Sequence, residues 1–572
     1  MSLNSLTYET VSDIQAGVRV IVEVGKKRHA GFVLGRSEKG LPDGVVAKPI
    51  EGVIDDECIL PPDLWDMALW AGKVCMCGYG AALKAVLPRH VYMGEKFYPS
   101  PKHEYIRGNF CERHCFNPFD SERVNFFAAE LEQGERTLIL FPQKETAKSF
   151  YEHLPDTMKQ EALLWPSDNS PKLWQAWKSV NAGQFRIVAA PPGGIFAPLM
   201  PRKIIVEDEA SPAYILPYTL NLSARSLAGH RAAFLGADFI TAGRIPSLKT
   251  YARTKPKETL RPERRNIILS DIHISRKEEV EGITGHVPLT FSLIKHTYRE
   301  IAQGNNVIWI LGRTGEASEV FCPNCGEAVK CPNCGGIMQA RNDGNILRCR
   351  KCGTLMDLPP KCDKCGYTLL VGRRAGIEAV AKIAGKYCND VHIFTEGSKL
   401  RDMHGLILST QRGLALCGKI NVGLVAWLDL DDELWGQNHN TRCNVYSMLC
   451  EAYWRGRENN PKRKVLIQAR RSGMKLAGFL AQGWTKFIRE ELRERKEFML
   501  PPYGYIIELE LGSKILREEI INLFMDAGIF VMDPGDNSLP LYVNAVSLEP
   551  IRKLLGSYTT LRNTIKITVR SE

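Results

Sequence analysis

The chain has 572 residues, 44% of them hydrophobic and 24% charged, with a formal net charge of +11. This length predicts roughly three to five domains instead of one core, and the positive charge favours polyanionic partners. No apolar run approaches the roughly 20 residues that a membrane span needs, which argues against a membrane protein.

The start, MSLNSLTYETVSD, has neither the basic nor the apolar region of a signal peptide. Seventeen cysteines in a chain without such a signal favour free thiols and metal ligands over a disulfide framework. We therefore expect a cytoplasmic protein.

Residues 1–92 alternate short apolar strands with turns. In GVRVIVEVGKKRHAGFVLG, two strands flank the segment from Gly25 to Arg28, which we interpret as a basic hairpin tip. The next segment, DLWDMALWAGKV, has apolar residues at helical spacing. This region is therefore predicted to be β-rich and then helical.

From residue 104 to 470 the pattern changes to short apolar strands, separated by helical segments. The strands read TLILF, FRIVAA, KIIVED, NVIWIL and VGLVAWLDL. This alternation is typical of parallel α/β units. From residue 471 we expect a long charged helix, which includes FLAQGWTKFIREELRERKEFM and stops at Pro501-Pro502, and then a small α+β tail.

Four Cys-x-x-Cys pairs form the strongest motif. The eight residues are Cys322, Cys325, Cys331, Cys334, Cys349, Cys352, Cys362 and Cys365. Each pair can present two thiolates to one metal, and a tetrahedral structural zinc needs two such pairs. A glycine follows every pair, as in zinc ribbons, so a redox motif or eight free thiols fit the pattern less well. The sequence predicts two Zn²⁺ per chain, in closed sites.

The spacing also predicts how the pairs combine. Fourteen residues separate the two inner pairs, which is enough for a β-hairpin that joins them in one site. The outer pairs then close the other site. The first predicted site is Cys322, Cys325, Cys362 and Cys365, and the second is Cys331, Cys334, Cys349 and Cys352.

The order of these cysteines within an α/β region resembles the primosomal protein N′ (PriA) family of replication-restart helicases. Further segments resemble the family in the same order: IFAPLMPRKIIVEDEASPAY, IPSLKTYAR, LDLDDELW, GRENNPKRKVLIQ and ERKEFMLPPYG. The N-terminal GVRVIVEVGKKRHAGFVLG and LWAGKVCMCGYGAALKAVLP are similar to the family's 3′-end DNA-binding domain. The stretch from 92 to 104 is too short for the winged-helix domain that the family usually has there.

The resemblance implies a multidomain α/β protein in four parts. These are a DNA-binding domain at 1–92, a first RecA-like lobe at 104–262, a second lobe at 263–470 with a zinc-binding insertion at 320–367, and a C-terminal α+β domain at 471–572. It places Tyr8, Gly25, Lys26, Lys27 and Arg28 next to DNA. Of the family's aromatic–Asp–Tyr segment only Tyr8 persists, because the chain reads Leu6-Thr7-Tyr8.

The nucleotide-binding motif of such a motor is missing. A P-loop, GxxxxGK[ST], uses glycine backbone N–H groups, a lysine and a hydroxyl to hold phosphates and Mg²⁺. In its place stands GNFCERHCFNPFDSERVNFF, with bulky Phe116, Asn117, Pro118 and Phe119. The sequence therefore argues against ATP and Mg²⁺ as cofactors. We interpret the cysteines and histidine of Cys111–Cys115 as parts of a structural turn.

Two other catalytic motifs are degenerate. The family's Asp-Glu-Glu-His carboxylate motif appears as Glu207, Asp208 and Glu209 followed by alanine, and we interpret it as a solvated strand end. Of two phosphate-binding arginines, only Arg457 matches, because Trp454 stands at the place of the first. We identify no confident catalytic residue, and the sequence favours a protein without enzymatic activity.

Three functions remain open. The favoured one is a non-catalytic replication-restart protein that binds branched or single-stranded DNA at stalled forks and assembles with other primosome or replication proteins. The second is an active ATP-dependent 3′–5′ DNA helicase with a divergent P-loop. The third is a zinc-ribbon adaptor between proteins, whose DNA affinity is incidental. No membrane partner is expected.

Overall fold

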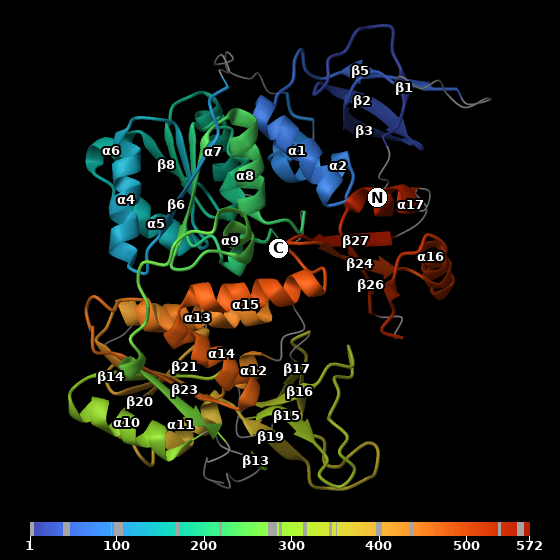
Figure 1. Ribbon diagram of the computed structural model, residues 1–572. Coiled ribbons are helices and arrows are strands. Elements are labelled where there is room, and N and C mark those ends of the chain that lie inside the picture. The colour runs from blue at the N-terminus through green and yellow to red at the C-terminus, as the bar shows by residue number, and fades with distance from the viewer. Residues whose placement is uncertain are drawn as a thin grey trace. The chain divides into compact units, whose positions relative to one another are not determined.

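The computed structural model describes most of the chain in ranges separated by gaps. The described residues are 5–37, 46–92, 94–96, 107–167, 171–216, 220–272, 283–284, 289–312, 317–341, 346–349, 352–395, 398, 403–434, 439–535, 539–556 and 565–572. Contacts group the chain into two compact units (Figure 1). The first is Met1–Asn117, Ser121–Pro256 and Ile488–Glu572, and the second is Pro118–Asp120 and Lys257–Phe487.

The N-terminal part of the first unit is β-rich and then helical, as predicted. Its strands are β1 (Tyr8–Glu9), β2 (Arg19–Val24), β3 (Lys27–Phe32), β4 (Lys48–Pro49) and β5 (Gly52–Val53). Strand β2 lies between β3 and β5 in an antiparallel sheet, and β1 pairs with β4 in parallel. Helices follow as α1 (Pro62–Val74), α2 (Tyr79–Val86) and α3 (Arg89–Tyr92). Most of the stretch from 92 to 104 lies outside the described residues.

The first unit also holds a parallel α/β lobe, called lobe 1 below. Its six parallel strands follow the order β6-β11-β10-β7-β9-β8. They are β6 (Cys111–Phe116), β7 (Thr137–Leu140), β8 (Ala162–Leu164), β9 (Ile187–Ala190), β10 (Lys203–Val206) and β11 (Asp238–Gly243). The helices are α4 (Asp120–Glu132), α5 (Lys144–Glu152), α6 (Asp156–Gln160), α7 (Pro171–Asn181), α8 (Ala224–Leu235) and α9 (Leu248–Thr254).

Alternate residues of each central strand pack in different hydrophobic cores, because successive side chains of a strand point to opposite faces of the sheet. Ile139 of β7 packs in the core that contains residues of α4 and α5. Its neighbours Leu138 and Leu140 face the opposite core, which contains residues of α7 and α8. A sheet buried on both faces explains why these strands read as unbroken apolar runs.

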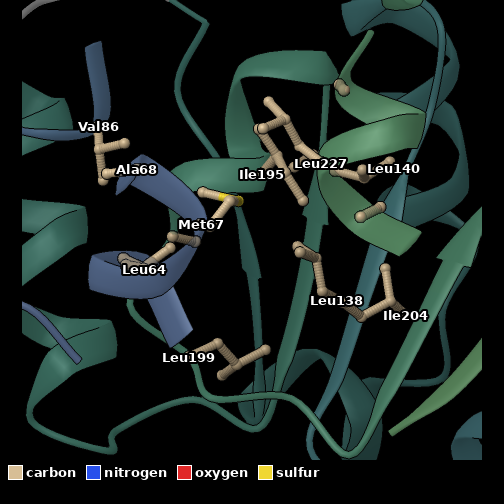
Figure 2. Packing of buried hydrophobic residues seen from close by; sticks show 14 of the residues in the cluster. Leu64, Met67, Ala68, Val86, Leu138, Leu140, Ile195, Leu199, Ile204 and Leu227 are labelled. Carbon is tan, nitrogen blue, oxygen red and sulfur yellow. The ribbon is translucent and has the colours of Figure 1, made fainter. Parts of the chain in front are cut away.

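The helices α1 and α2 belong to the same hydrophobic core as lobe 1. Figure 2 shows Leu64 and Met67 of α1 with Ile195 and Leu227 of lobe 1 in one cluster of buried side chains. A fully buried ion pair adds to the contact: Arg231 Nε of α8 lies 2.6 Å from Asp63 Oδ2 of α1. The other two guanidinium nitrogens of Arg231 donate to the carbonyls of Ile195 and Ala197. These helices are therefore an integral part of the lobe.

The C-terminal part of the first unit is a small α+β fold. Its antiparallel sheet has the order β25-β26-β24-β27. The strands are β24 (Tyr505–Leu511), β25 (Val531–Met532), β26 (Leu541–Ala545) and β27 (Ile565–Arg570), and the helices are α16 (Lys514–Asp526) and α17 (Leu548–Gly556). Residues of α16 and α17 share one core with the sheet, as expected for the predicted tail.

The second unit holds another six-stranded parallel sheet, with the order β12-β23-β22-β14-β21-β20, which we call lobe 2. The strands are β12 (Ile267–Asp271), β14 (Asn306–Ile310), β20 (Val391–Phe394), β21 (Leu406–Ser409), β22 (Val422–Trp427) and β23 (Lys464–Ala469). Its helices are α10 (Phe291–Ala302), α11 (Ile377–Ala384), α12 (Leu430–Glu433), α13 (Thr441–Trp454) and α14 (Arg471–Gln482).

A separate sheet, formed by β13 and by strands between β14 and α11, carries the cysteine pairs. Its order is β13-β19-β15-β16-β17-β18, and it is antiparallel except for the pair of β13 and β19. The strands are β13 (Ile283–Thr284), β15 (Ala317–Phe321), β16 (Met338–Arg341), β17 (Ile346–Cys349), β18 (Leu355–Asp357) and β19 (Val371–Ala375). Two α/β lobes, this insertion and the two terminal parts confirm the predicted fold class.

The single long helix expected near the C-terminal end is wrong. The segment forms α14 and then α15 (Trp484–Glu497), with a break at Gly483. Gly483 has a φ of +89°, and the Glu258 carboxylate accepts the backbone N–H of Trp484 at 2.7 Å, which satisfies one of the free donors at the start of α15. The helix also ends before Pro501-Pro502, at Glu497.

Candidate functional site

The eight cysteine sulfurs converge in two groups of four, in the combination that the spacing predicts. In each group the sulfur atoms lie within 4.8 Å of one another, with Cys322, Cys325, Cys362 and Cys365 in one group and Cys331, Cys334, Cys349 and Cys352 in the other. Pairs of sulfurs lie 3.4–3.6 Å apart in Cys322–Cys365, Cys325–Cys362, Cys331–Cys352 and Cys334–Cys349.

The local sequence explains this convergence. The glycine after each pair, at 326, 335, 353 and 366, adopts a left-handed φ between +68° and +77°. Each glycine N–H donates to the carbonyl of the first cysteine of its pair, at 2.9–3.1 Å. The four turns therefore repeat one geometry, which needs a residue without Cβ at the left-handed position.

The surroundings of two sulfurs favour the thiolate, whereas hydrogen bonds with neighbouring sulfurs raise the pKa of Cys325 and Cys334 to about 12. The Thr354 hydroxyl and backbone N–H lower the pKa of Cys352 to about 6. The Tyr367 backbone N–H and the Asn324 side chain lower the pKa of Cys365 to about 6 as well. Zinc–sulfur bonds of about 2.3 Å place tetrahedral thiolates about 3.8 Å apart, close to the distances here. Both groups therefore fit a tetrahedral metal ion.

The basic hairpin forms as predicted. Gly25, with a φ of +67°, and Lys26 make the two-residue turn between β2 and β3, where glycine tolerates the left-handed conformation. The side chains of Lys26, Lys27 and Arg28 are exposed. Arg28 Nε lies 2.7 Å from Glu51 Oε2. Two lysines and one partly neutralised arginine therefore project from one end of the sheet.

Tyr8 is brought beside the hairpin, although 15 residues separate it from Glu23. Its hydroxyl donates to the Glu23 carbonyl at 3.0 Å, and its ring is partly buried. Lys48, which the sequence did not single out, donates to the Gly25 carbonyl at 3.1 Å and pairs with the Glu23 carboxylate at 3.0 Å. The parallel pairing of β1 with β4 puts Tyr8 opposite Lys48, a contact with no local signal in the sequence.

The place of the missing P-loop is a short connection in the structure. Strand β6 ends at Phe116 and helix α4 begins at Asp120, so only three residues join them. A P-loop has eight positions from its first glycine to its hydroxyl, and its backbone curls around phosphates. Cys111–Cys115 lies in strand β6 and does not form the expected turn. Among the described residues, its cysteines and histidine do not gather with other potential metal ligands.

An arginine neutralises the first of the three acidic residues at the end of β10. Arg123 of α4 is buried, and its Nε and one terminal nitrogen each lie 2.9 Å from Glu207 Oε1. Its other terminal nitrogen donates to the Asn117 carbonyl at 2.5 Å. The guanidinium thus joins the strand end to the short connection after β6. The prediction of a solvated strand end is therefore wrong for Glu207.

Glu209 also binds partners within the lobe. It is buried, one of its carboxylate oxygens lies 2.9 Å from Arg225, and the other accepts the Ser247 backbone N–H at 2.7 Å. Asp208, between the two glutamates, has a left-handed φ of +50° and no ion pair among the described residues. Two of the three carboxylates thus have internal partners.

Arg457 points inward as well. Its side chain donates to the carbonyls of Pro461 at 2.7 Å and Arg463 at 3.1 Å, and its guanidinium lies 3.8 Å from the centre of the Tyr453 ring. Burial lowers the pKa of Arg457. The guanidinium of Arg457 thus donates its hydrogen bonds to the loop that follows α13. An arginine that contacts phosphate would need these donors free.

Comparisons with known proteins show which proteins this chain resembles. The family model of the 3′ DNA-binding domain (3′BD) matches residues 3–88. The curated protein "Replication restart protein PriA" of Helicobacter pylori J99 is 24% identical over 423 residues, which are 68% of this chain and 64% of the relative. The proteins of the same name from Thermotoga maritima and Bacillus subtilis are 23% and 21% identical. The chain resembles these PriA proteins over most of its length, at low identity.

The chain matches only part of these PriA relatives. The aligned regions span 64%, 48% and 49% of the H. pylori, T. maritima and B. subtilis proteins. Among solved structures, an S. cerevisiae Dbp5 variant bound to RNA and ADP–BeF3 covers 77% of this chain and 98% of its own, with 11% identity and a TM-score of 0.33. RecG bound to a three-way DNA junction gives 8% identity, coverage of 73% and 46%, and a TM-score of 0.35.

No helix among the described ranges combines the length and apolar composition of a membrane span.

Proposed function

We propose that this protein is a DNA-binding replication-restart protein that recognises branched DNA or stalled forks and works without helicase activity. The observation that carries the proposal is the exposed basic hairpin, because it lies within the segment that matches a 3′ DNA-binding domain. The name of the curated relatives supports a role in replication restart. Other primosome or replication proteins are the proposed partners.

We propose Zn²⁺ as the ion of both four-cysteine groups. Closed sites with four thiolates are typical of structural zinc. With all four positions of a tetrahedron taken by protein, the ion would hold the insertion together and leave no position for a substrate. The eight cysteines would be its ligands, and their role would be structural.

The proposed lack of helicase activity rests on lobe 1. Phosphoryl transfer depends on positioned cations and backbone N–H groups around the phosphates. The three-residue connection after β6 offers no such cradle, and Arg123 already neutralises Glu207. The remnants Glu207, Asp208, Glu209 and Arg457 would then be scaffold residues. An active helicase would need another nucleotide site.

A binding titration tests the DNA-binding role. We expect tighter binding to a fork with a nascent 3′ end than to a blunt duplex of equal length. Replacing Lys26, Lys27 and Arg28 with alanine should weaken fork binding. It should also reduce the salt dependence, by about one log-log unit for each phosphate that the variant no longer neutralises. Zinc content should not change.

A matched control removes the same charge elsewhere in the first unit. Lys144, Lys148 and Lys172 are exposed on α5 and α7, and their triple alanine variant loses the same formal charge of three. We expect this variant to bind the fork like the unmodified protein. Equal weak binding to fork and duplex, unaffected by the hairpin change, would reject the proposal and favour an adaptor between proteins.

A further inference from the structure

Helix α10 of lobe 2 presents an unusual surface. Phe291 at its first position is 73% exposed and Tyr298 is 46% exposed. Seven residues, or nearly two helical turns, separate them, so both rings lie on one face about 10.5 Å apart along the axis. The exposed Lys295 lies between them on that face, and the exposed Arg299 is one turn further along. We call these four residues the α10 face; α10 is labelled in Figure 1.

Within the described part of the chain, no acid pairs with Lys295 or Arg299, the two cations of the α10 face. The single acid of the helix, Glu300, is buried and paired with Lys464 at 2.9 Å. Burial lowers the pKa of His296, and Lys464, Lys295 and Arg299 lower it further, which is the effect of a positive potential at this surface.

We propose that the α10 face binds single-stranded DNA, as a contact separate from the basic hairpin. Aromatic rings interleaved with cations match the alternation of bases and phosphates in an unpaired strand. The bases stack on the rings and the phosphates approach the cations. This inference rests on the proposed DNA-binding function and adds a place where an unpaired strand would lie on the second unit.

An unpaired strand fits this face better than duplex DNA does. In a duplex the faces of the bases are covered by their neighbours, so the rings would find nothing to stack on. An acidic protein segment would use the two cations but would gain less from two rings that stand apart. Dependence on the rings as well as on the charge therefore distinguishes single-stranded DNA from a general polyanion.

The test compares ring and charge variants of the full chain. The probe is a fluorescent oligonucleotide of about 20 thymidines, and the readout is anisotropy at near-physiological salt. Phe291→Ala with Tyr298→Ala should weaken binding at least about fivefold, because one stacked base is worth about 1–3 kcal/mol. Lys295→Ala with Arg299→Ala should weaken binding and reduce its salt dependence.

Two controls isolate the rings. Tyr298→Phe keeps the ring and should bind like the unmodified protein. Phe530→Ala removes a phenylalanine that is 77% exposed in the first unit, and it should have no effect. In an oligonucleotide with 5-iodouracil, light should crosslink the DNA to Phe291 or Tyr298, as peptide mapping would show.

The outcomes separate this inference from the proposed function. If the hairpin variant loses fork binding while both α10 variants bind the oligonucleotide normally, the inference fails and the proposed function stands. If polyglutamate competes and the ring variant binds normally, the face is a general polyanion site and the inference fails. If the unmodified protein binds neither fork nor oligonucleotide, both fail. Weaker binding of both α10 variants, with the crosslink, supports the inference.

Discussion

The four-cysteine insertion and the acidic end of β10 differ in how their negative charge is balanced. In the insertion, eight sulfurs gather in two groups, and the nearby lysines Lys330 and Lys364 pair with Glu327. At the end of β10, Glu207 pairs with Arg123, and Glu209 pairs with Arg225, which also pairs with Glu572. The first arrangement fits an added metal ion, whereas the charge of the second is largely balanced by the protein itself.

This difference bears on the proposed loss of a metal-dependent function in lobe 1. A cluster of anionic ligands is stable only when a cation compensates its charge. Where the chain supplies that cation, as at Glu207 and Glu209, we propose that the residues act as scaffold without Mg²⁺. The four predictions below test this contrast between the insertion and lobe 1, from the largest expected effect to the smallest.

Removing a zinc ligand should have the largest effect. Cys331→Ser or Cys349→Ser should release one of two zinc ions per chain and unfold the local hairpin, because a structural zinc site contributes on the order of 10 kcal/mol. Metal analysis of the purified protein measures this. Cys443→Ser, a cysteine outside both groups, should retain two ions. Fewer than two ions in the unmodified protein would contradict the assignment.

Removing the internal cation of lobe 1 should have a smaller but clear effect. Arg123→Ala leaves the Glu207 carboxylate without its buried partner and should lower the free energy of unfolding by roughly 3 kcal/mol. Urea unfolding of the full chain, followed by tryptophan fluorescence to which Trp174 and Trp177 of lobe 1 contribute, measures it.

Two comparisons sharpen this second experiment. Replacing both partners, Arg123→Met with Glu207→Leu, should recover most of the lost free energy of unfolding, because no buried charge is then left unpaired. Arg186→Ala breaks a more exposed pair with Glu161 and should cost at most about 1 kcal/mol. A loss below about 1 kcal/mol for Arg123→Ala would mean that the β10 end is not balanced from within.

A pH-dependent contribution is expected from Glu572. Burial disfavours its charge, but Arg225 and Lys249 outweigh burial and lower the pKa of Glu572 to about 2. Because the pKa is lower in the folded state, the stabilisation is present above about pH 4.5 and is lost as the pH falls toward 2. Glu572→Gln should therefore lower the free energy of unfolding by about 2 kcal/mol at neutral pH.

The same variant gives its own control. In urea unfolding, the difference between Glu572→Gln and the unmodified protein should shrink between about pH 4.5 and pH 3. A difference that stays constant over this range would show that the glutamate charge does not contribute through Arg225.

The smallest expected effect is that of nucleotide. ATP with Mg²⁺ should leave the melting temperature of the protein unchanged, because we propose that lobe 1 does not bind nucleotide. A ligand that did bind, at 100 times its dissociation constant, would add about 2.7 kcal/mol of stability. Asp208→Ala should change nothing further. ATP turnover on forked DNA at roughly 1 s⁻¹ or faster, abolished in Asp208→Ala, would show that lobe 1 is a working motor.

The strands and the cysteine groups follow from short-range patterns. Five apolar runs became β7, β9, β10, β14 and β22, because strands buried on both faces need unbroken apolar sequence. The two cysteine groups also follow from local spacing, since each Cys-x-x-Cys-Gly turn has its own geometry.

Long-range partners did not follow from the sequence. Arg123 and Glu207 are 84 residues apart, and no spacing rule connects them. The break at Gly483 could have been predicted from the glycine, but the carboxylate that caps α15 comes from Glu258, 226 residues away. Lys48 beside the hairpin depends on the pairing of β1 with β4. Such contacts arise only when the chain is folded.

The core that α1 and α2 share with lobe 1 has a consequence for synthesis. The apolar face of α1 leaves the ribosome about 150 residues before α8, which packs on it in the finished protein. At roughly 5–20 residues per second it remains uncovered for about 7–30 seconds. During this interval the apolar face of α1 is exposed to chaperones and to other nascent chains, so this helix needs protection in the newborn protein.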